Sequence, residues 1–129
     1  MRKRILLVTL LVSVLGIVLL SVLFTDVFYR QSIEAVNGQL QIYMDVYAAE
    51  RQGEPLTQEG AEAFAAELRG VRVTFLAADG TVLGDSEADA AAMEDHSGRE
   101  EVAEALENGE GFAVRDSATL GYDSVYYCR

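Results

Sequence analysis

Cysteine, proline and histidine are scarce in this sequence of 129 residues, and each scarcity excludes a class of structure or site. The single cysteine, Cys128, cannot form an intrachain disulfide. We expect it to be a small apolar residue in a strand, with pairing between two chains as the alternative. The single proline, Pro55, leaves residues 26–50 free to be helical. The single histidine, His96, excludes a metal site built from several histidines.

Basic residues are also few beyond the N-terminal region. From Arg30 onward the chain has seven arginines and no lysine against twenty acidic residues, a net charge of −13. Such a surface would repel nucleic acid, which is therefore excluded as a partner, and it disfavours docking on anionic lipid. The sequence has no glycine-rich phosphate loop, nucleophile elbow or metal-ligand motif, so we expect no catalytic, cofactor-binding or metal site.

The sequence does have one long apolar run, Ile5–Phe24, which contains no charged residue. As a helix of about 1.5 Å per residue it would be roughly 30 Å long, the thickness of the hydrocarbon core of a bilayer. Basic residues precede the run at positions 2–4, and the positive-inside rule places such residues in the cytoplasm. We therefore expect residues 1–4 to form a cytoplasmic tip, residues 5–24 to cross the cell membrane in contact with lipid, and the remainder to be extracellular. A cleaved signal peptide is the alternative, but its apolar core is usually shorter, about 7–15 residues.

Residues 25–50 continue without a helix breaker except Gly38 and predict a juxtamembrane helix. Apolar residues recur there at steps of three and four, as in a heptad pattern. Two interpretations of this stripe remain open: it packs on the domain that follows, or it pairs with the same helix of a second subunit in a homodimer. The stripe consists of Ile33, Val36, Leu40, Tyr43 and Tyr47.

Residues 51–129 predict one α+β domain, an antiparallel sheet with helices packed on it. We expect a helix over Gln58–Arg69, capped by Thr57 and Gly70, with Ala61, Phe64, Ala65 and Leu68 on its apolar face. Strands over Val71–Ala78 and Thr81–Gly84 should meet at a type I′ turn formed by Asp79 and Gly80. A capping box, Ser97 to Glu100, should begin a helix over Arg99–Asn108 that buries Val102, Ala105 and Leu106 and ends at Gly109. Strands over Gly111–Arg115 and Tyr122–Cys128 should follow, around a turn-rich segment at 116–121.

Six polar side chains in this domain are candidates for binding a ligand or signal: Arg72, Asp85, Ser86, His96, Arg99 and Arg115. The Asp85-Ser86 pair suits an amine or carboxylate ligand, but the same pair commonly caps a turn. The three arginines would suit an anion such as phosphate, but each also suits a nearby carboxylate. His96 would be a weak metal ligand beside two acidic neighbours, or a plain structural residue.

The order of several short motifs resembles the extracellular sensor domain of bacterial membrane sensor histidine kinases, most closely the phosphate-regulon type of Gram-positive bacteria. The run RVTFLAADGTVLGDS (72–86) carries most of this resemblance. The motifs that follow in the same order are MEDH (93–96), REEV (99–102), GEG (109–111), RDSAT (115–119) and YY (126–127). Glu100 stands where that family usually has proline, which leaves the start of the helix to the capping box.

The resemblance implies a PAS-like sensor domain over residues 51–129, incomplete at its C-terminus, that serves as the extracellular signal-sensing input region of a two-component sensor histidine kinase. It also implies a kinase core outside these residues, which would bind ATP and Mg and contact the cognate response regulator. The present chain would then have no catalytic activity of its own. A chemoreceptor or cyclic-dinucleotide enzyme with a similar sensor region, and a stand-alone membrane-anchored interaction domain, are the alternatives.

Overall fold

The computed structural model describes residues 2–51, 53–117 and 122–129. The described chain is α+β and divides into two compact units, residues 1–38 and 39–129. Its helices and strands follow in the order α1 (Arg2–Glu50), α2 (Gln58–Glu67), β1 (Thr74–Leu76), β2 (Val82–Asp85), the 3₁₀ turn η1 (Ala90–Ala92), α3 (Glu100–Asn108), β3 (Gly111–Ser117) and β4 (Tyr122–Cys128). Apart from η1, this is the predicted order of elements. Most of the predicted turn at 116–121, and Ala118 and Thr119 of the RDSAT motif, lie outside the described residues.

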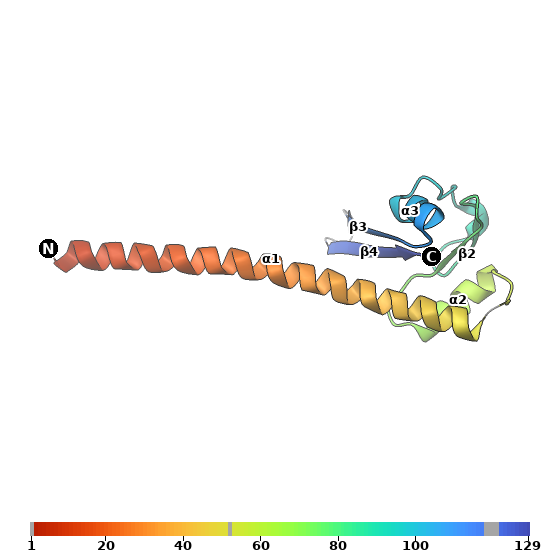
Figure 1. Cartoon of the computed structure of the whole chain (residues 1–129), viewed down its shortest axis with the longest axis horizontal. Coiled ribbons are helices and arrows are strands. Elements are labelled where there is room, and N and C mark those ends of the chain that lie inside the picture. Colours follow the sequence, from red (N-terminus) through yellow and green to blue (C-terminus); the bar gives the residue numbers. More distant parts are fainter. Residues whose placement is uncertain (1, 52, 118–121) are drawn as a thin grey trace. The chain divides into compact units, whose positions relative to one another are not determined.

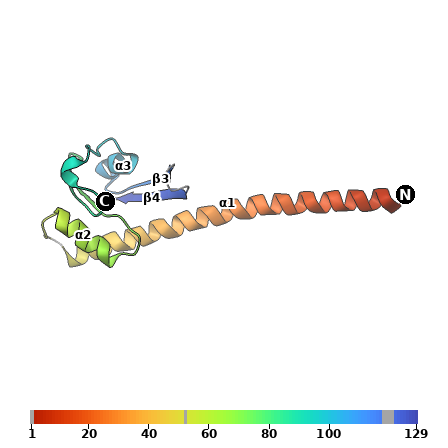
Figure 2. The ribbon, with the colours of Figure 1, turned by 180° about the vertical axis from the view of Figure 1, so that it is seen from behind.

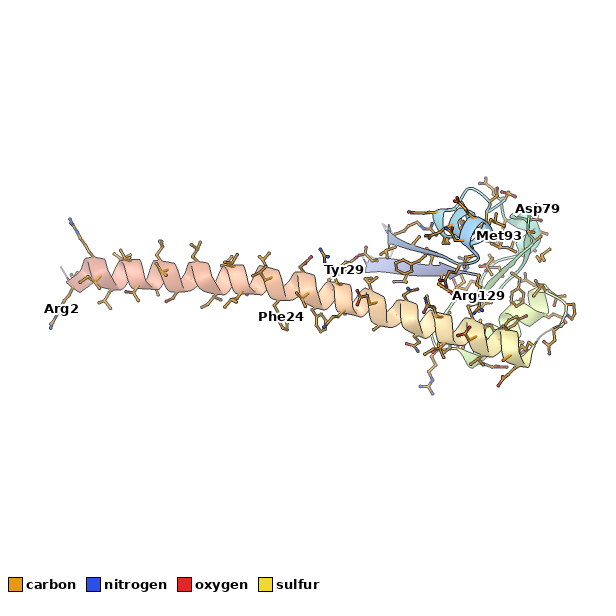
Figure 3. All side chains as sticks on the ribbon, viewed as in Figure 1. Arg2, Phe24, Tyr29, Asp79, Met93 and Arg129 are labelled. Atoms are coloured by element: carbon orange, nitrogen blue, oxygen red, sulfur yellow. The ribbon has the colours of Figure 1, made fainter. Side chains whose placement is uncertain are left out.

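The first unit consists of the N-terminal part of α1, which continues unbroken through the predicted junction near residue 25 (Figure 1). The helix is long and apolar enough there to cross a membrane, a property that signal sequences share. Its apolar side chains point outward all around the helix, as Phe24 does in Figure 3, and none of its residues is buried. The prediction of a single continuous helix is therefore confirmed.

The second unit begins with the last turns of α1, which pack against α2 (Figure 2). The ring of Tyr47 lies 4.8 Å from that of Phe64 in α2 and 5.4 Å from that of Phe75 in β1, measured between centroids. Ala61 and Phe64 are buried, as the apolar pattern of α2 predicts. Thr57 caps α2 by accepting a hydrogen bond from the backbone N–H of Gly60, which confirms its predicted role.

The end of α2 differs from the prediction. The helix stops at Glu67, and Leu68 takes the C-cap position with extended backbone angles while its N–H donates to the carbonyl of Ala65. The backbone of Gly70 does adopt a positive φ of 73°, but two residues beyond the cap. The predicted end at Arg69 with Gly70 as cap is therefore wrong, because an extended residue at 68 has already broken the helical hydrogen bonds.

Strands β1 and β2 form the predicted hairpin with a different turn. The N–H of Gly80 donates to the carbonyl of Ala77, and the N–H of Ala77 donates to the carbonyl of Thr81. Gly80 has a φ of 90°, whereas no described residue other than glycine has a positive φ. A type I′ turn needs positive φ at both central residues, so Asp79 excludes it. The geometry is that of a three-residue loop with glycine in the left-handed position.

The hairpin is also shorter and less regular than predicted. Its register shifts between Phe75 and Leu76, so that Leu83 forms a bulge in β2. The bulge disrupts the regular pairing of the ladder, and Val82, Gly84 and Asp85 are buried while Leu83 is exposed. Strand β1 does not extend back to Val71, since the N–H of Val73 already donates to the Ser86 hydroxyl instead of to a backbone carbonyl. These irregularities explain why the predicted strand over Val71–Ala78 is reduced to Thr74–Leu76.

Helix α3 covers the second hairpin and ends at Gly109, which adopts the left-handed conformation expected of a C-cap. Its start is not the predicted capping box: the Ser97 hydroxyl donates to the Asp95 carboxylate, and Arg99 occupies the N-cap without a side-chain hydrogen bond. Val102 is buried as predicted and Ala105 is partly buried. The prediction that Leu106 is buried is wrong, since it is 55% exposed, and the acidic Glu101 takes the inward position instead.

Strands β3 and β4 pair antiparallel in continuous register, from Gly111 opposite Cys128 to Ser117 opposite Tyr122. Cys128 is half-buried in β4, as expected of a small apolar residue, and burial raises the pKa of its thiol. The prediction of one sheet is wrong for the described residues, which form two separate two-stranded sheets. Each hairpin has its own covering helix, α2 on β2 and α3 on β3, so each closes a small core of its own.

Candidate functional site

Asp85, a candidate ligand residue, is completely buried at the end of β2. Its carboxylate accepts hydrogen bonds from Arg72 Nε (3.0 Å to each oxygen) and from the Thr74 hydroxyl (2.6 Å). The backbone N–H groups of Glu87 and Ala88 donate to the same carboxylate at 2.9 Å. A carboxylate has about four acceptor positions, and these donors fill them. Asp85 is therefore an anchor for the turn after β2, as the turn-cap interpretation of Asp85-Ser86 predicts.

The electrostatics of Asp85 favour its charged form. Burial by itself would raise the pKa of the carboxyl group, but hydrogen bonds from Thr74, Arg72 and the Glu87 N–H, together with the positive charge of Arg72, outweigh burial and lower the pKa below the ordinary 3.8. Because the Arg72 side chain is 44% exposed, only one partner of this ion pair is fully desolvated. The carboxylate therefore stays ionised and its partners stay in place at neutral pH.

Gln58, the first residue of α2, connects this anchor to the rest of the domain. Its Nε2 donates to the carbonyl oxygens of Asp85 (2.6 Å) and Ala88 (3.1 Å). Its Oε1 accepts from the backbone N–H of Asp85 at 3.1 Å. The bonds join residues 27 and 30 positions apart, so no local motif in the sequence could have marked Gln58 as important. They hold the start of α2 against the bulged end of β2.

Ser86 and His96 both hold the β1–β2 hairpin through backbone bonds. The Ser86 hydroxyl accepts from the N–H of Val73, and the Ser86 N–H donates to the Val73 carbonyl. His96 is 5% exposed, and its backbone N–H donates to the carbonyl of Gly80 at the hairpin turn. Its Nδ1 lies 2.8 Å from the Glu94 carbonyl, which assigns the ring proton to Nδ1, and its buried Nε2 has no partner within the described part of the chain.

His96 is not brought together with other metal ligands. Of its acidic neighbours, Asp95 accepts the backbone N–H of Ser97 at 2.9 Å, while Glu94 contributes its backbone carbonyl. Among residues 2–51, 53–117 and 122–129 no group of three histidine, cysteine or acidic side chains is placed to hold a metal ion. The geometry at His96 is that of a structural residue.

Arg115 forms the second buried ion pair of the domain. Its two terminal nitrogens donate to the two oxygens of Glu101, at 2.7 and 2.6 Å, and its guanidinium carbon lies 3.8 Å from the centre of the Tyr126 ring. Glu101 is 4% exposed. Burial would raise the pKa of Glu101, but the hydrogen bonds and charge of Arg115 lower it. This arrangement joins α3, β3 and β4.

The three candidate arginines therefore have different surroundings. Arg72 binds Asp85 beside the first hairpin, and Arg115 binds Glu101 beside the second. Arg99 begins α3, where its carbonyl accepts from the backbone N–H groups of the following turn. The pairing interpretation describes Arg72 and Arg115 well, and binding of an anion by these residues stays a prediction.

A polar groove of about 340 Å³ lies at the end of the second hairpin where β3 begins and β4 ends. None of the six candidate residues lines it. Its walls come from the last turns of α1, the end of α3 and the end of β4. The lining residues are Gln41, Asp45, Asn108, Gly109, Glu110, Tyr127 and Arg129. Helix turns, a loop and a strand end from three parts of the sequence converge here, which is why the sequence alone gave no sign of this groove.

Two polar contacts cross this groove. Arg129, labelled at the end of β4 in Figure 3, forms an ion pair with Asp45 of α1. The Tyr127 hydroxyl donates to Glu110 Oε2 at 2.8 Å. Burial, followed by the hydrogen bond and charge of Glu110, raises the pKa of Tyr127 to about 12, so the phenol remains a donor. The groove thus presents both positive and negative groups to solvent.

The groove remains as a candidate binding site within the described residues, because the donors around Asp85 fill its acceptor positions and the buried Glu101 is paired with Arg115. Comparisons with protein-family models, with curated proteins and with solved structures found no match to this chain.

Proposed function

We propose that this chain is the signal-input region of a membrane sensor histidine kinase, anchored by the apolar part of α1 with residues 51–129 outside the cell. The proposal rests on the ordered motifs from Arg72 to Tyr127 and on the charge of the N-terminal tip. ATP, Mg and the cognate response regulator would act on a kinase core outside these residues. The chain itself would neither bind ATP nor transfer phosphate.

The observation that best supports an input role is that one helix, α1, provides both the candidate membrane span and part of the core of the second unit. The same α1 that is apolar near its N-terminus supplies Tyr47 to the aromatic core of the second unit. Any repacking around Phe64 and Phe75 therefore acts directly on the backbone of α1. A ligand would shift that packing only by its difference in affinity for two arrangements.

We further propose that the input region works as a homodimer through α1. Of the predicted stripe, Tyr47 packs within its own domain, which supports the intrachain interpretation at that end. Ile33, Leu40 and Tyr43 of the stripe are half-buried, whereas Val36 is 42% exposed. Outside the stripe, Ile42 and Val46, one turn apart on α1, are 61% and 43% exposed. Apolar surface of this kind on a helix suits contact with the same helix of a second copy.

Cysteine labelling in intact cells tests the orientation. In a Cys128→Ser background, we expect Leu106→Cys, at an exposed position of α3, to react with a membrane-impermeant maleimide in intact cells. Lys3→Cys is the matched control and should react only after the cells are made permeable. The reverse pattern would contradict the proposed orientation. Release of a shortened protein without the Lys3→Cys label would show a cleaved signal peptide.

The identity of the output is tested by the coding sequence beyond codon 129. We expect a second membrane-spanning segment followed by a helix with a phosphoacceptor histidine and an ATP-binding domain. A methyl-accepting domain, a cyclic-dinucleotide enzyme or an immediate stop codon would each overturn the assignment to histidine kinases, whatever the orientation of this chain.

A further inference from the structure

The polar groove beside Arg129 has the size and chemistry of a small-molecule site. Its volume of about 340 Å³ lies in the range of ligand pockets, roughly 300–1,000 Å³. Its lining includes no aliphatic side chain. Ligands usually enter apolar pockets with a few polar groups, so a groove with this lining favours a small, strongly polar ligand over a lipid or another apolar molecule.

The negative side of the groove is built around Glu110. This residue follows Asn108 and Gly109 at the carboxyl end of α3, where the helix dipole places partial negative charge. The Tyr127 hydroxyl holds one carboxylate oxygen of Glu110, and a carboxylate retains further acceptor positions beyond one hydrogen bond. The carboxylate and the helix end together suit the N–H groups of an ammonium ion.

The positive side of the groove is Arg129. One of its terminal nitrogens contacts Asp45, and a guanidinium has five N–H donors in all. Both side chains of this pair are largely exposed, 49% for Arg129 and 66% for Asp45, so solvent screens the pair strongly. Arg129 therefore has N–H donors left for an incoming carboxylate.

The two sides belong to one electrostatic environment. The charges of Glu110 and Asp45 both act on Arg129, and the charge of Arg129 acts on Tyr127. A ligand with only one charge would bind only one of these sides, whereas a zwitterion can bind both. We propose that the groove binds the zwitterion of a free α-amino acid, with its ammonium group at Glu110 and the end of α3 and its carboxylate at Arg129.

Such a ligand would connect the last turns of α1 with the ends of α3 and β4. The inference names a ligand class for the proposed input function and rests on that function only for the consequence of binding. Binding itself is measured on the purified full chain in detergent, where membrane orientation has no influence. Its failure is therefore distinguishable from failure of the labelling experiment on orientation.

Titration calorimetry with L-serine tests the proposal against two analogues that each lack one charge. We expect L-serine to bind, and N-acetyl-L-serine, without the ammonium group, and L-serinamide, without the carboxylate, to bind at least about tenfold more weakly. Absence of heat from L-serine at millimolar concentrations would overturn the proposal. Equal binding of either analogue would overturn it as well, because that charge would then not be recognised.

Substitutions of Glu110 and Arg129 test whether the amino acid binds in this groove. Glu110→Gln keeps an acceptor for the Tyr127 hydroxyl but removes the charge, and Arg129→Gln removes the cation. Each should weaken L-serine binding by about tenfold or more. Glu107→Gln is the matched control, since Glu107 lies on the same helix α3 but does not line the groove, and it should bind as the unaltered chain does. Unchanged binding by both groove variants would show that the amino acid binds elsewhere and would overturn the assignment.

Discussion

Replacing Asp85 with alanine is expected to lower the free energy of unfolding of the second unit by about 3–5 kcal/mol, the typical cost of removing one partner of a buried ion pair. The substitution leaves the Thr74 hydroxyl and the N–H groups of Glu87 and Ala88 without their acceptor. It also leaves Arg72 without its carboxylate. Small domains are stable by only about 5–15 kcal/mol, so the loss should be visible as a large fall in the urea midpoint.

The measurement is urea unfolding of the full chain in detergent, followed by near-ultraviolet circular dichroism of the tyrosines, because α1 would dominate a far-ultraviolet signal. Asp85→Asn preserves the shape but replaces one acceptor oxygen with a donor, so it should also be strongly destabilising. Asp79→Ala is the control, since this exposed carboxylate of the same hairpin accepts from the backbone of Thr81 and should matter little. Equal midpoints for Asp85→Ala and Asp79→Ala would contradict the role of Asp85.

The lowered pKa of Asp85 predicts how stability changes in acid. In the unfolded chain the carboxyl group takes up a proton near its ordinary pKa of 3.8, whereas in the folded domain it does so only at lower pH. The stabilising contribution is therefore complete above about pH 5 and declines as the pH falls toward the folded pKa. We expect the free energy of unfolding to fall between pH 5 and pH 3, and to fall less steeply in Asp85→Asn. Identical pH dependence of the two proteins would contradict this prediction.

Local signals predicted the parts of the fold that depend on neighbouring residues. Thr57 caps α2, Gly109 caps α3 and Gly80 takes the positive φ of the hairpin turn, because each role is decided within three or four residues. The continuity of α1 was likewise predictable, because no proline precedes Pro55 and Gly38 is the one breaker within residues 25–50. The α+β fold class could be predicted from this order of helices and strands, but the split into two small sheets could not.

Features that depend on distant residues were not predictable. The Ser97-x-x-Glu100 pattern fits a capping box, yet Asp95 competes successfully for the Ser97 hydroxyl. Glu101 looks like a solvent-exposed residue until Arg115, fourteen positions later, provides a partner in the interior. The groove needs residues 84 positions apart, Asp45 and Arg129. Spacing rules describe one helix or strand at a time, whereas these contacts arise only when several elements pack together.

The close approach of β3 to α3 depends on Gly111, and Gly111→Ala is the second substitution with a large expected effect. A Cβ at this position would lie 2.8 Å from the backbone nitrogen of Ala105 and the carbonyl carbon of Glu101. Backbone atoms cannot rotate away as a side chain can, so β3 would have to move off the helix. Overpacking of this kind costs about 1–3 kcal/mol and occasionally more.

The loss of stability should be larger than the volume of one methyl group implies, because the two bonds between Arg115 of β3 and Glu101 of α3 span the same interface. Moving the strand would leave Glu101 buried without its partner. We therefore expect Gly111→Ala to lower the urea midpoint well below that of the unaltered chain. Gly98→Ala is the matched control, because a Cβ there meets no atom within 4 Å, and its midpoint should hardly change. If the two variants unfold at the same urea concentration, α3 and β3 do not pack as closely as described, and the buried Glu101–Arg115 pair would lose its structural basis.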